Sequence, residues 1–141
     1  MTDHDELQDI IQDFLAETEK SLEPLEESIL LLKQFVYFVP LDFQIQAYMS
    51  FFAGLNIDFY LEHIRNVNRV VHTIKGLAGF IGLDNLKNYC HDVENLTTGI
   101  AKGELLLNQE VYDVIARIPV WISRALESVR DQGHDKSLDT E

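Results

Sequence analysis

The sequence is poor in cysteine, in basic residues and in long hydrophobic runs, and each shortage excludes a class of protein. The single cysteine, Cys90, permits no intrachain disulfide and is expected to be a small buried hydrophobe in a reducing compartment. The 141 residues include 11 Lys and Arg against 24 Asp and Glu, and this net charge of −13 disfavours binding to nucleic acid or anionic membranes. The longest apolar run, residues 29–39, is about half a membrane span. Because the acidic N-terminus also lacks a secretory signal, we expect a one-domain cytoplasmic protein.

Strand-like alternation and internal repeats are lacking too, and apolar residues recur instead at the three- and four-residue steps of a helix face. Amphipathic helices are predicted at about residues 7–32, 58–81, 83–102 and 108–129. Pro24 should kink the first or divide it into two in-line pieces, while Pro119 should kink the fourth, which Asn108 should cap. The pattern predicts an all-α fold, an antiparallel up-down four-helix bundle, over residues 1–130. Residues 131–141 are expected to form a polar tail or the start of a linker.

Residues 35–54, "FVYFVPLDFQIQAYMSFFAG", form an insert that does not fit a minimal bundle. They contain five of the eight phenylalanines of the chain. Pro40 breaks the insert, and Asp42 is placed to cap an additional short helix that runs to about Ala53. Two interpretations stay open, because the insert can fold back and enlarge the core or present an apolar surface to a partner or a second copy.

The stretch "VHTIKGLAGF", residues 71–80, combines a histidine, a lysine and two glycines with an apolar helix pattern. Successive residues turn by about 100° around a helix, so His72 lies about 140° from the centre of the apolar stripe at Val67. His72 is therefore expected to be exposed, whereas His63 falls inside the stripe and is expected to be packed and hydrogen-bonded. The neighbours predicted on or beside the exposed face are Asn68, Lys75, Gly76 and Gly79, and of these Asn68, Gly76 and Gly79 are expected to contact a docking partner. The small glycines would let a second protein dock close to the imidazole.

The third predicted helix supplies a partner for His72. If the second and third helices form a hairpin around Gly82, residues equidistant from the turn meet. His72 lies ten residues before Gly82, and His91 and Glu94 lie nine and twelve residues after it. A carboxylate at this level can accept the Nδ1 proton of His72, which fixes the tautomer and leaves Nε2 as an exposed nucleophile. Lys75 would then stand beside an anion attached to Nε2.

This constellation suits reversible phosphorylation on nitrogen. The sequence has neither a GxxxxGK[ST] nucleotide-binding loop nor an Asp cluster for magnesium. The chain is therefore expected to bind no cofactor and to be no enzyme on its own. It would carry a phosphoryl group that other proteins add and remove, with ATP and Mg²⁺ bound by the partner domains.

The run "RVVHTIKGLAGFIGLDNL" at residues 69–86, followed by "HDVEN" at residues 91–95, resembles the histidine phosphotransfer (HPt) domain. The likeness is to the N-terminal phosphoacceptor domain of CheA-type chemotaxis kinases. It depends on the pattern R-x-x-H-[ST]-[LI]-K-G-x-[AS]-x-x-x-G and on the 19- and 22-residue spacings from His72 to His91 and Glu94. The resemblance covers the four predicted helices but not the insert, which is longer than the usual connection of the family.

The resemblance implies a function and a role for each matching residue. The ATP-binding domain of a histidine kinase would phosphorylate His72, and the phosphoryl group would pass to an aspartate of a CheY-like response regulator receiver. Glu94 would orient the imidazole, and Lys75 and His91 would support it. Such a chain could be the phosphoacceptor fragment of a larger kinase or a free-standing protein.

Two other functions remain as alternatives. His72, His91 and Glu94 make a two-histidine, one-carboxylate set of the kind that binds metal ions, although Lys75 beside them favours an anion. A non-catalytic adaptor bundle would instead bind a partner through the aromatic insert at residues 35–54, with His72 as an ordinary surface histidine.

Overall fold

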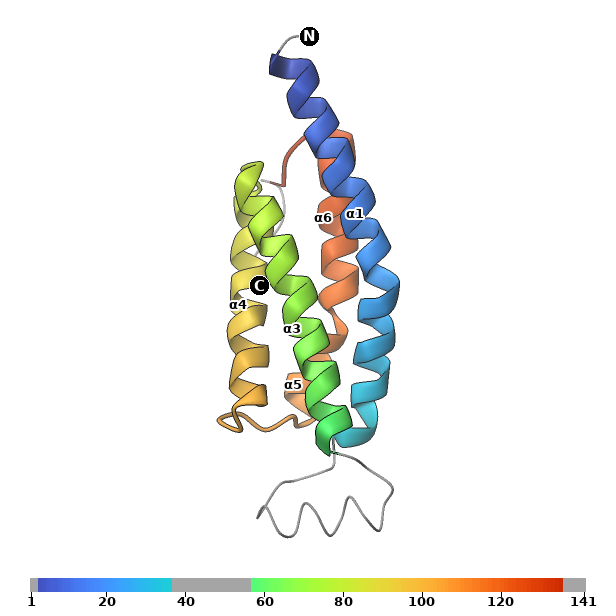
Figure 1. Cartoon of the computed structure of the whole chain (residues 1–141), viewed down its shortest axis with the longest axis vertical. Coiled ribbons are helices and arrows are strands. Elements are labelled where there is room, and N and C mark those ends of the chain that lie inside the picture. Colours follow the sequence, from blue (N-terminus) through green and yellow to red (C-terminus); the bar gives the residue numbers. More distant parts are fainter. Residues whose placement is uncertain (1–2, 37–56, 136–141) are drawn as a thin grey trace.

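The computed structural model describes residues 3–36 and 57–135, and all regular structure within these ranges is helical. The elements are α1 (Asp3–Leu32), the 3₁₀ turn η1 (Lys33–Phe35), α3 (Ile57–Phe80), α4 (Asp84–Ala101), α5 (Gln109–Ala116) and α6 (Ile118–Gln132). Figure 1 shows α1, α3, α4 and the α5–α6 pair running lengthwise beside one another in alternating directions. The predicted all-α, up-down bundle is confirmed.

The core of the bundle is built from the apolar stripe of each helix. The inward positions predicted for α3 are confirmed, because Val67, Val71, Ile74 and Ala78 are at most 2% exposed. The largest buried side chains from the other helices include Leu25, Leu32, Leu86, Ile115, Ile118, Ile122 and Leu126. A helix with such a stripe is stabilised mainly by its burial against neighbours, since helical propensity alone contributes little.

The two interior prolines have different effects. Pro24 lies within α1, which continues through it as one helix, and the proline sits on the exposed face. Pro119 falls in the first turn of α6, where a missing N–H costs least, so the predicted fourth helix is two helices meeting at Arg117. The prediction of one kinked helix is wrong in this respect. The predicted cap is confirmed, since the Asn108 side chain accepts a hydrogen bond from the Val111 N–H at 2.9 Å.

The turn between α3 and α4 sets the register of the functional site. Gly82 adopts the left-handed conformation with φ of 78°, and the Leu83 N–H donates to the Ala78 carbonyl at 2.8 Å. This Schellman arrangement ends α3 and reverses the chain. Only glycine adopts this backbone conformation without strain, so the predicted stop at Gly82 has a direct conformational cause.

The start of α4 is capped from a distant part of the chain. Leu83, at the N-cap position, makes no side-chain hydrogen bond, and the Leu86 N–H instead donates to the Asp135 carboxylate at 2.7 Å. Asn85 donates to the Asp135 backbone carbonyl at 2.8 Å, and Asp135 is only 2% exposed. Residues 131–141 were expected to form a polar tail or the start of a linker. Their first residues are instead part of the bundle, because α6 runs to Gln132 and Asp135 packs on α4.

The aromatic insert is described only at its beginning. Phe35 and Val36 are buried, and the Phe35 ring contacts Phe59 and Tyr60 of α3. The additional short helix predicted within residues 35–54 lies outside the described residues.

Candidate functional site

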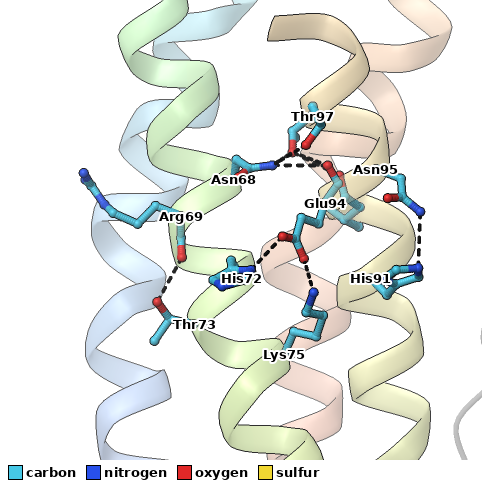
Figure 2. Close-up of polar contacts among 11 residues, drawn as sticks. Asn68, Arg69, His72, Thr73, Lys75, His91, Glu94, Asn95 and Thr97 are labelled. Carbon is cyan, nitrogen blue, oxygen red and sulfur yellow. Dashed lines mark hydrogen bonds and ion pairs between the residues drawn. The ribbon is translucent and has the colours of Figure 1, made fainter. Parts of the chain in front are cut away.

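His72 lies in the middle of α3 with 63% of its side chain exposed, as the helical rotation predicted. Its Nδ1 atom is 2.6 Å from Oε1 of Glu94 on α4 (Figure 2). Because an ionised carboxylate only accepts hydrogen bonds, Nδ1 is the nitrogen that carries the proton. In the neutral ring, the other nitrogen, Nε2, is therefore the one with a free electron pair. The hairpin register derived from the sequence places the two residues together as expected.

Lys75 contacts the other oxygen of the same carboxylate, since its Nζ is 2.6 Å from Oε2 of Glu94. Figure 2 shows His72 and Lys75 reaching from α3 to the two oxygens of Glu94. The hydrogen bond from Lys75, and then that from His72, holds the pKa of Glu94 below its ordinary value, while partial burial acts in the opposite direction. Glu94 is therefore a stable anion at neutral pH. Lys75 was expected beside Nε2, and it is bound to the carboxylate that orients the ring.

Asn68 contacts α4 through its side-chain nitrogen. Nδ2 lies 3.1 Å from the Glu94 carbonyl oxygen, 2.7 Å from Thr97 Oγ1 and 3.1 Å from Thr98 Oγ1. The sequence predicted a docking position on the exposed flank for Asn68. The structure makes it half-buried, with its nitrogen directed to the neighbouring helix. Helical rotation placed Asn68 on the correct flank, but it could not identify the threonines of α4 that meet it there.

His91 lies apart from the pair formed by His72 and Glu94. It is exposed on α4, and its Nε2 is 3.4 Å from Nδ2 of Asn95, one turn further along the same helix. Figure 2 shows His91 beside Asn95 and turned away from His72. His91 and Glu94 are three residues apart on α4, so their side chains differ in direction by about 60° around the helix axis. This rotation directs His91 away from α3. The spacing predicted the level of His91 correctly, and its supporting role stays a prediction.

The residues of the proposed metal set are therefore not gathered around one point. Across residues 3–36 and 57–135, no group of three or more His, Cys, Asp and Glu side chains is placed to hold a metal ion. Lys75 also occupies one oxygen of Glu94. These contacts give no support to the metal-binding alternative.

Gly76 leaves open space next to His72. A Cβ atom at Gly76 would meet nothing within 4 Å, whereas one at Gly79 would lie 3.4 Å from Cδ of Lys87. Gly76 thus leaves the surface bare, and Gly79 makes room for the aliphatic part of a lysine from α4. His72, Gly76 and Phe80 follow at four-residue steps, so they form one row along the exposed face of α3. Phe80, at the end of this row, is 76% exposed.

An apolar groove continues from this row towards α1. Its volume is about 200 Å³, and it is lined by Ile10, Asp13, Phe14, Glu17, Leu77, Phe80 and Ile81. This groove was not predicted from the sequence. A signal was present, since Leu77 and Phe80 are apolar residues outside the stripe centred on Val67, but sequence does not reveal that α1 forms the opposite wall.

Two further predictions concern residues that pack inside the bundle. His63 is 9% exposed, its Nδ1 is 3.3 Å from Ser28 Oγ, and its ring packs edge-on against Phe59. Burial, and then the nearby negative charge of Glu94, raises the pKa of the Cys90 thiol to about 12, while the positive charge of Lys75 acts in the opposite direction. Cys90 is therefore protonated and unreactive, and both residues are buried as predicted.

Comparison with protein families matches residues 9–132 to the Hpt domain. Among curated proteins, the sensor histidine kinase CheAY of Helicobacter pylori (strain ATCC 700392 / 26695) is 28% identical over 131 residues. The chemotaxis protein CheA of Rhizobium meliloti (strain 1021) is 35% identical over 72 residues, and CheA of Treponema pallidum (strain Nichols) is 26% identical over 121 residues. No solved structure gives a significant match.

The matched regions cover most or half of this chain but only a small share of each relative. They cover 93%, 51% and 86% of this chain but only 14%, 10% and 12% of the respective relatives. The chain thus spans a small part of the length of these relatives. None of the helices in residues 3–36 and 57–135 has the length and apolar character needed to cross a membrane.

Proposed function

Because the chain belongs to the Hpt domain family, we propose that it is a phosphorelay carrier in chemotaxis-type two-component signalling, with His72 as its phosphoacceptor. The observation that carries this assignment is the 2.6 Å contact between His72 Nδ1 and Glu94 Oε1 on an otherwise exposed imidazole. It supports the tautomer in which Nδ1 carries the proton, so that in the neutral ring the free electron pair is on Nε2, the form that can attack phosphorus.

In the proposed reaction, Nε2 of His72 attacks the γ-phosphorus of ATP held by a kinase ATP-binding domain. The bond from phosphorus to the bridging oxygen breaks and ADP leaves, while the new bond joins phosphorus to Nε2. The ring becomes cationic as this bond forms, and the Glu94 carboxylate stabilises that charge through the Nδ1 proton. In the return step, an aspartate oxygen of a CheY-like receiver attacks phosphorus, and the electron pair of the broken N–P bond returns to Nε2.

Lys75 supports this chemistry in two ways. Its ammonium group pairs with Glu94 and keeps it ionised. Its positive charge, three residues after His72 on the same helix, would also favour an anionic phosphoryl group on the ring. Cations are scarce in a chain with net charge −13, so this lysine offsets an otherwise repulsive field for phosphate.

A partner must approach Nε2 closely, and the row formed by His72, Gly76 and Phe80 offers the surface for it. Gly76 leaves space above the backbone, and the groove beyond Phe80 offers apolar contact with Asp13 and Glu17 at its border. The kinase domain and the receiver would both use this surface, because both must reach the same nitrogen. The supporting role of His91 is then a contact to the partner from α4, since its side chain is exposed.

The chain would supply the phosphoacceptor, while its partners supply ATP, Mg²⁺ and the transfer catalysis in the cytoplasm. The relatives named as sensor histidine kinase and chemotaxis protein are several times longer than this chain. Their length is in keeping with a carrier domain that works together with separate kinase and receiver domains.

The proposal is tested by incubating the chain with ATP and the ATP-binding domain of a CheA-type kinase. A phosphate that is labile in acid and stable in base is expected, and His72→Gln should abolish it. His63→Gln serves as the matched control that keeps the label. Adding a panel of receivers should then remove the phosphate and identify the partner. Labelling that persists in the His72→Gln protein would refute the assignment.

A further inference from the structure

The side chain of Asn68 joins the helix that carries His72 to the backbone of Glu94. Asn68 lies on α3 one turn before His72, and its Nδ2 is 3.1 Å from the Glu94 carbonyl oxygen. The same nitrogen is 2.7 Å from Thr97 Oγ1 (Figure 2) and 3.1 Å from Thr98 Oγ1. Two N–H groups are thus shared among three oxygen atoms on consecutive turns of α4.

The acceptors fix the orientation of the Asn68 amide. A backbone carbonyl can only accept, so the amide atom facing the Glu94 oxygen must be the nitrogen. The Thr97 hydroxyl lies 3.1 Å from the carbonyl oxygens of both Val93 and Glu94, to which it donates its own proton. Its oxygen is then left to accept from Asn68. Thr97 is fully buried, and exclusion of water strengthens these hydrogen bonds.

Asn68 holds Glu94 differently from His72 and Lys75. The latter two bind the carboxylate at the end of a side chain that can rotate, whereas Asn68 binds the backbone of the same residue. A contact to the backbone fixes the position of the Glu94 turn of α4 relative to α3, measured along the axis of α3. Because His72 follows Asn68 by one helical turn, the same contact sets the level at which the carboxylate meets the imidazole.

We infer that Asn68 is a positioning residue, which fixes the register of α4 so that Glu94 holds the Nδ1 proton of His72. It does not touch the reacting atoms and acts through Glu94. This role differs from the docking role that the sequence suggested. Its consequence for phosphoryl transfer rests on the proposed function, but its effect on the His72 ring does not.

The first test measures the ring directly, without any partner. Asn68→Leu keeps a similar volume and removes the donor. Long-range ¹H–¹⁵N spectra of the unphosphorylated protein should show that His72 loses its preference for the Nδ1–H tautomer. Tyr112→Phe is the matched control, because it removes a buried hydrogen bond to the Ile29 carbonyl at another part of the bundle. This control should leave the His72 signals unchanged.

The second test measures the reactivity of Nε2 with phosphoramidate, a small phosphodonor. Nε2 attacks phosphorus, the P–N bond of the donor breaks and ammonia leaves, so no protein partner is involved. Asn68→Leu should slow phosphorylation of His72 about tenfold, the size of effect typical for lost orienting contacts. In a Glu94→Ala background, where no side chain at this position accepts the Nδ1 proton, the same substitution should cause no further loss, because its effect passes through Glu94.

A third test uses two variants of Thr97, and it applies even if Asn68→Leu fails to fold. Thr97→Val removes the acceptor at nearly constant volume, and Thr97→Ser retains it. We expect the valine variant to reproduce the loss and the serine variant to restore the wild-type ring signals. Wild-type His72 signals in Asn68→Leu or Thr97→Val would overturn the inference. If the ring signals change but no kinase phosphorylates the wild-type chain, the proposed function fails and the positioning role stands.

Discussion

The Nδ1 atom of His72 lies 2.6 Å from Oε1 of Glu94, across the hairpin formed by α3 and α4. The contact joins an exposed imidazole to a carboxylate that is only 19% exposed. It assigns different tasks to the two ring nitrogens, because the anchored one holds the proton and the other keeps its electron pair.

Glu94→Gln should slow phosphorylation of His72 by a kinase about tenfold without unfolding the bundle. The amide oxygen can still accept the Nδ1 proton, but it cannot stabilise the positive charge that develops on the ring. Asp92→Asn removes an equal charge from the exposed face of the same helix and should leave the rate unchanged. Equal rates for wild type and Glu94→Gln, measured by phosphate incorporation over time, would contradict the role of the Glu94 charge.

The Glu94 carboxyl group should titrate below the ordinary glutamate value of about 4.3. Since Lys75 is the largest cause of the lowered pKa, Lys75→Met should move the midpoint upward, and carboxyl ¹³C shifts measure it. Lys87→Met, a change at an exposed lysine on α4, serves as the control. Because the folded-state pKa is depressed, the stabilisation from Glu94 is present above about pH 4.3 and is lost as the pH falls through the folded-state value. A midpoint that Lys75→Met leaves unchanged would contradict this account.

Gly76→Gln should separate stability from function. A Cβ at this position meets no atom within 4 Å, so the bundle accommodates the side chain, and the better helix former should add about 0.5 kcal/mol of stability. The longer side chain beside His72 should nevertheless hinder both the kinase and the receiver. We expect a higher urea midpoint, an unchanged rate with phosphoramidate and slower transfer with either protein partner. Unimpaired transfer would show that partners approach from another side.

Asp135→Ala should destabilise the bundle by about 1–2 kcal/mol, because it removes the carboxylate that caps α4. Asp131→Ala, an exposed change in the last turn of α6, should stay within about 0.5 kcal/mol of wild type. Urea unfolding followed by circular dichroism measures both. Equal stability of the two variants would show that the Leu86 N–H finds an equally good partner without Asp135.

The features that follow from local periodicity could be predicted from the sequence. The apolar stripe of α3, the stop at Gly82 and the cap at Asn108 each depend on residues close in the chain. The meeting of His72 and Glu94 needed one further step, a hairpin with a known turn. The resemblance to the HPt family is confirmed by the match over residues 9–132.

The features that depend on contacts between distant helices could not be predicted. Asn68 finds its acceptors on α4, and Asp135 caps a helix that begins some fifty residues earlier. His91 stands at the expected level but faces Asn95, because a spacing along the chain gives the level of a residue and not the direction of its side chain. Pro119 marked the place of a break, but whether a helix bends or divides there depends on packing.

The chemical position of the phosphoryl group tests the central claim most directly. Protein labelled with ¹⁵N in its histidine rings would be phosphorylated by a CheA-type kinase domain and examined for ¹⁵N–³¹P coupling. The account predicts that the phosphate is on Nε2 of His72, with the proton still on Nδ1. Phosphate on Nδ1 of His72, or on any other residue, would contradict it.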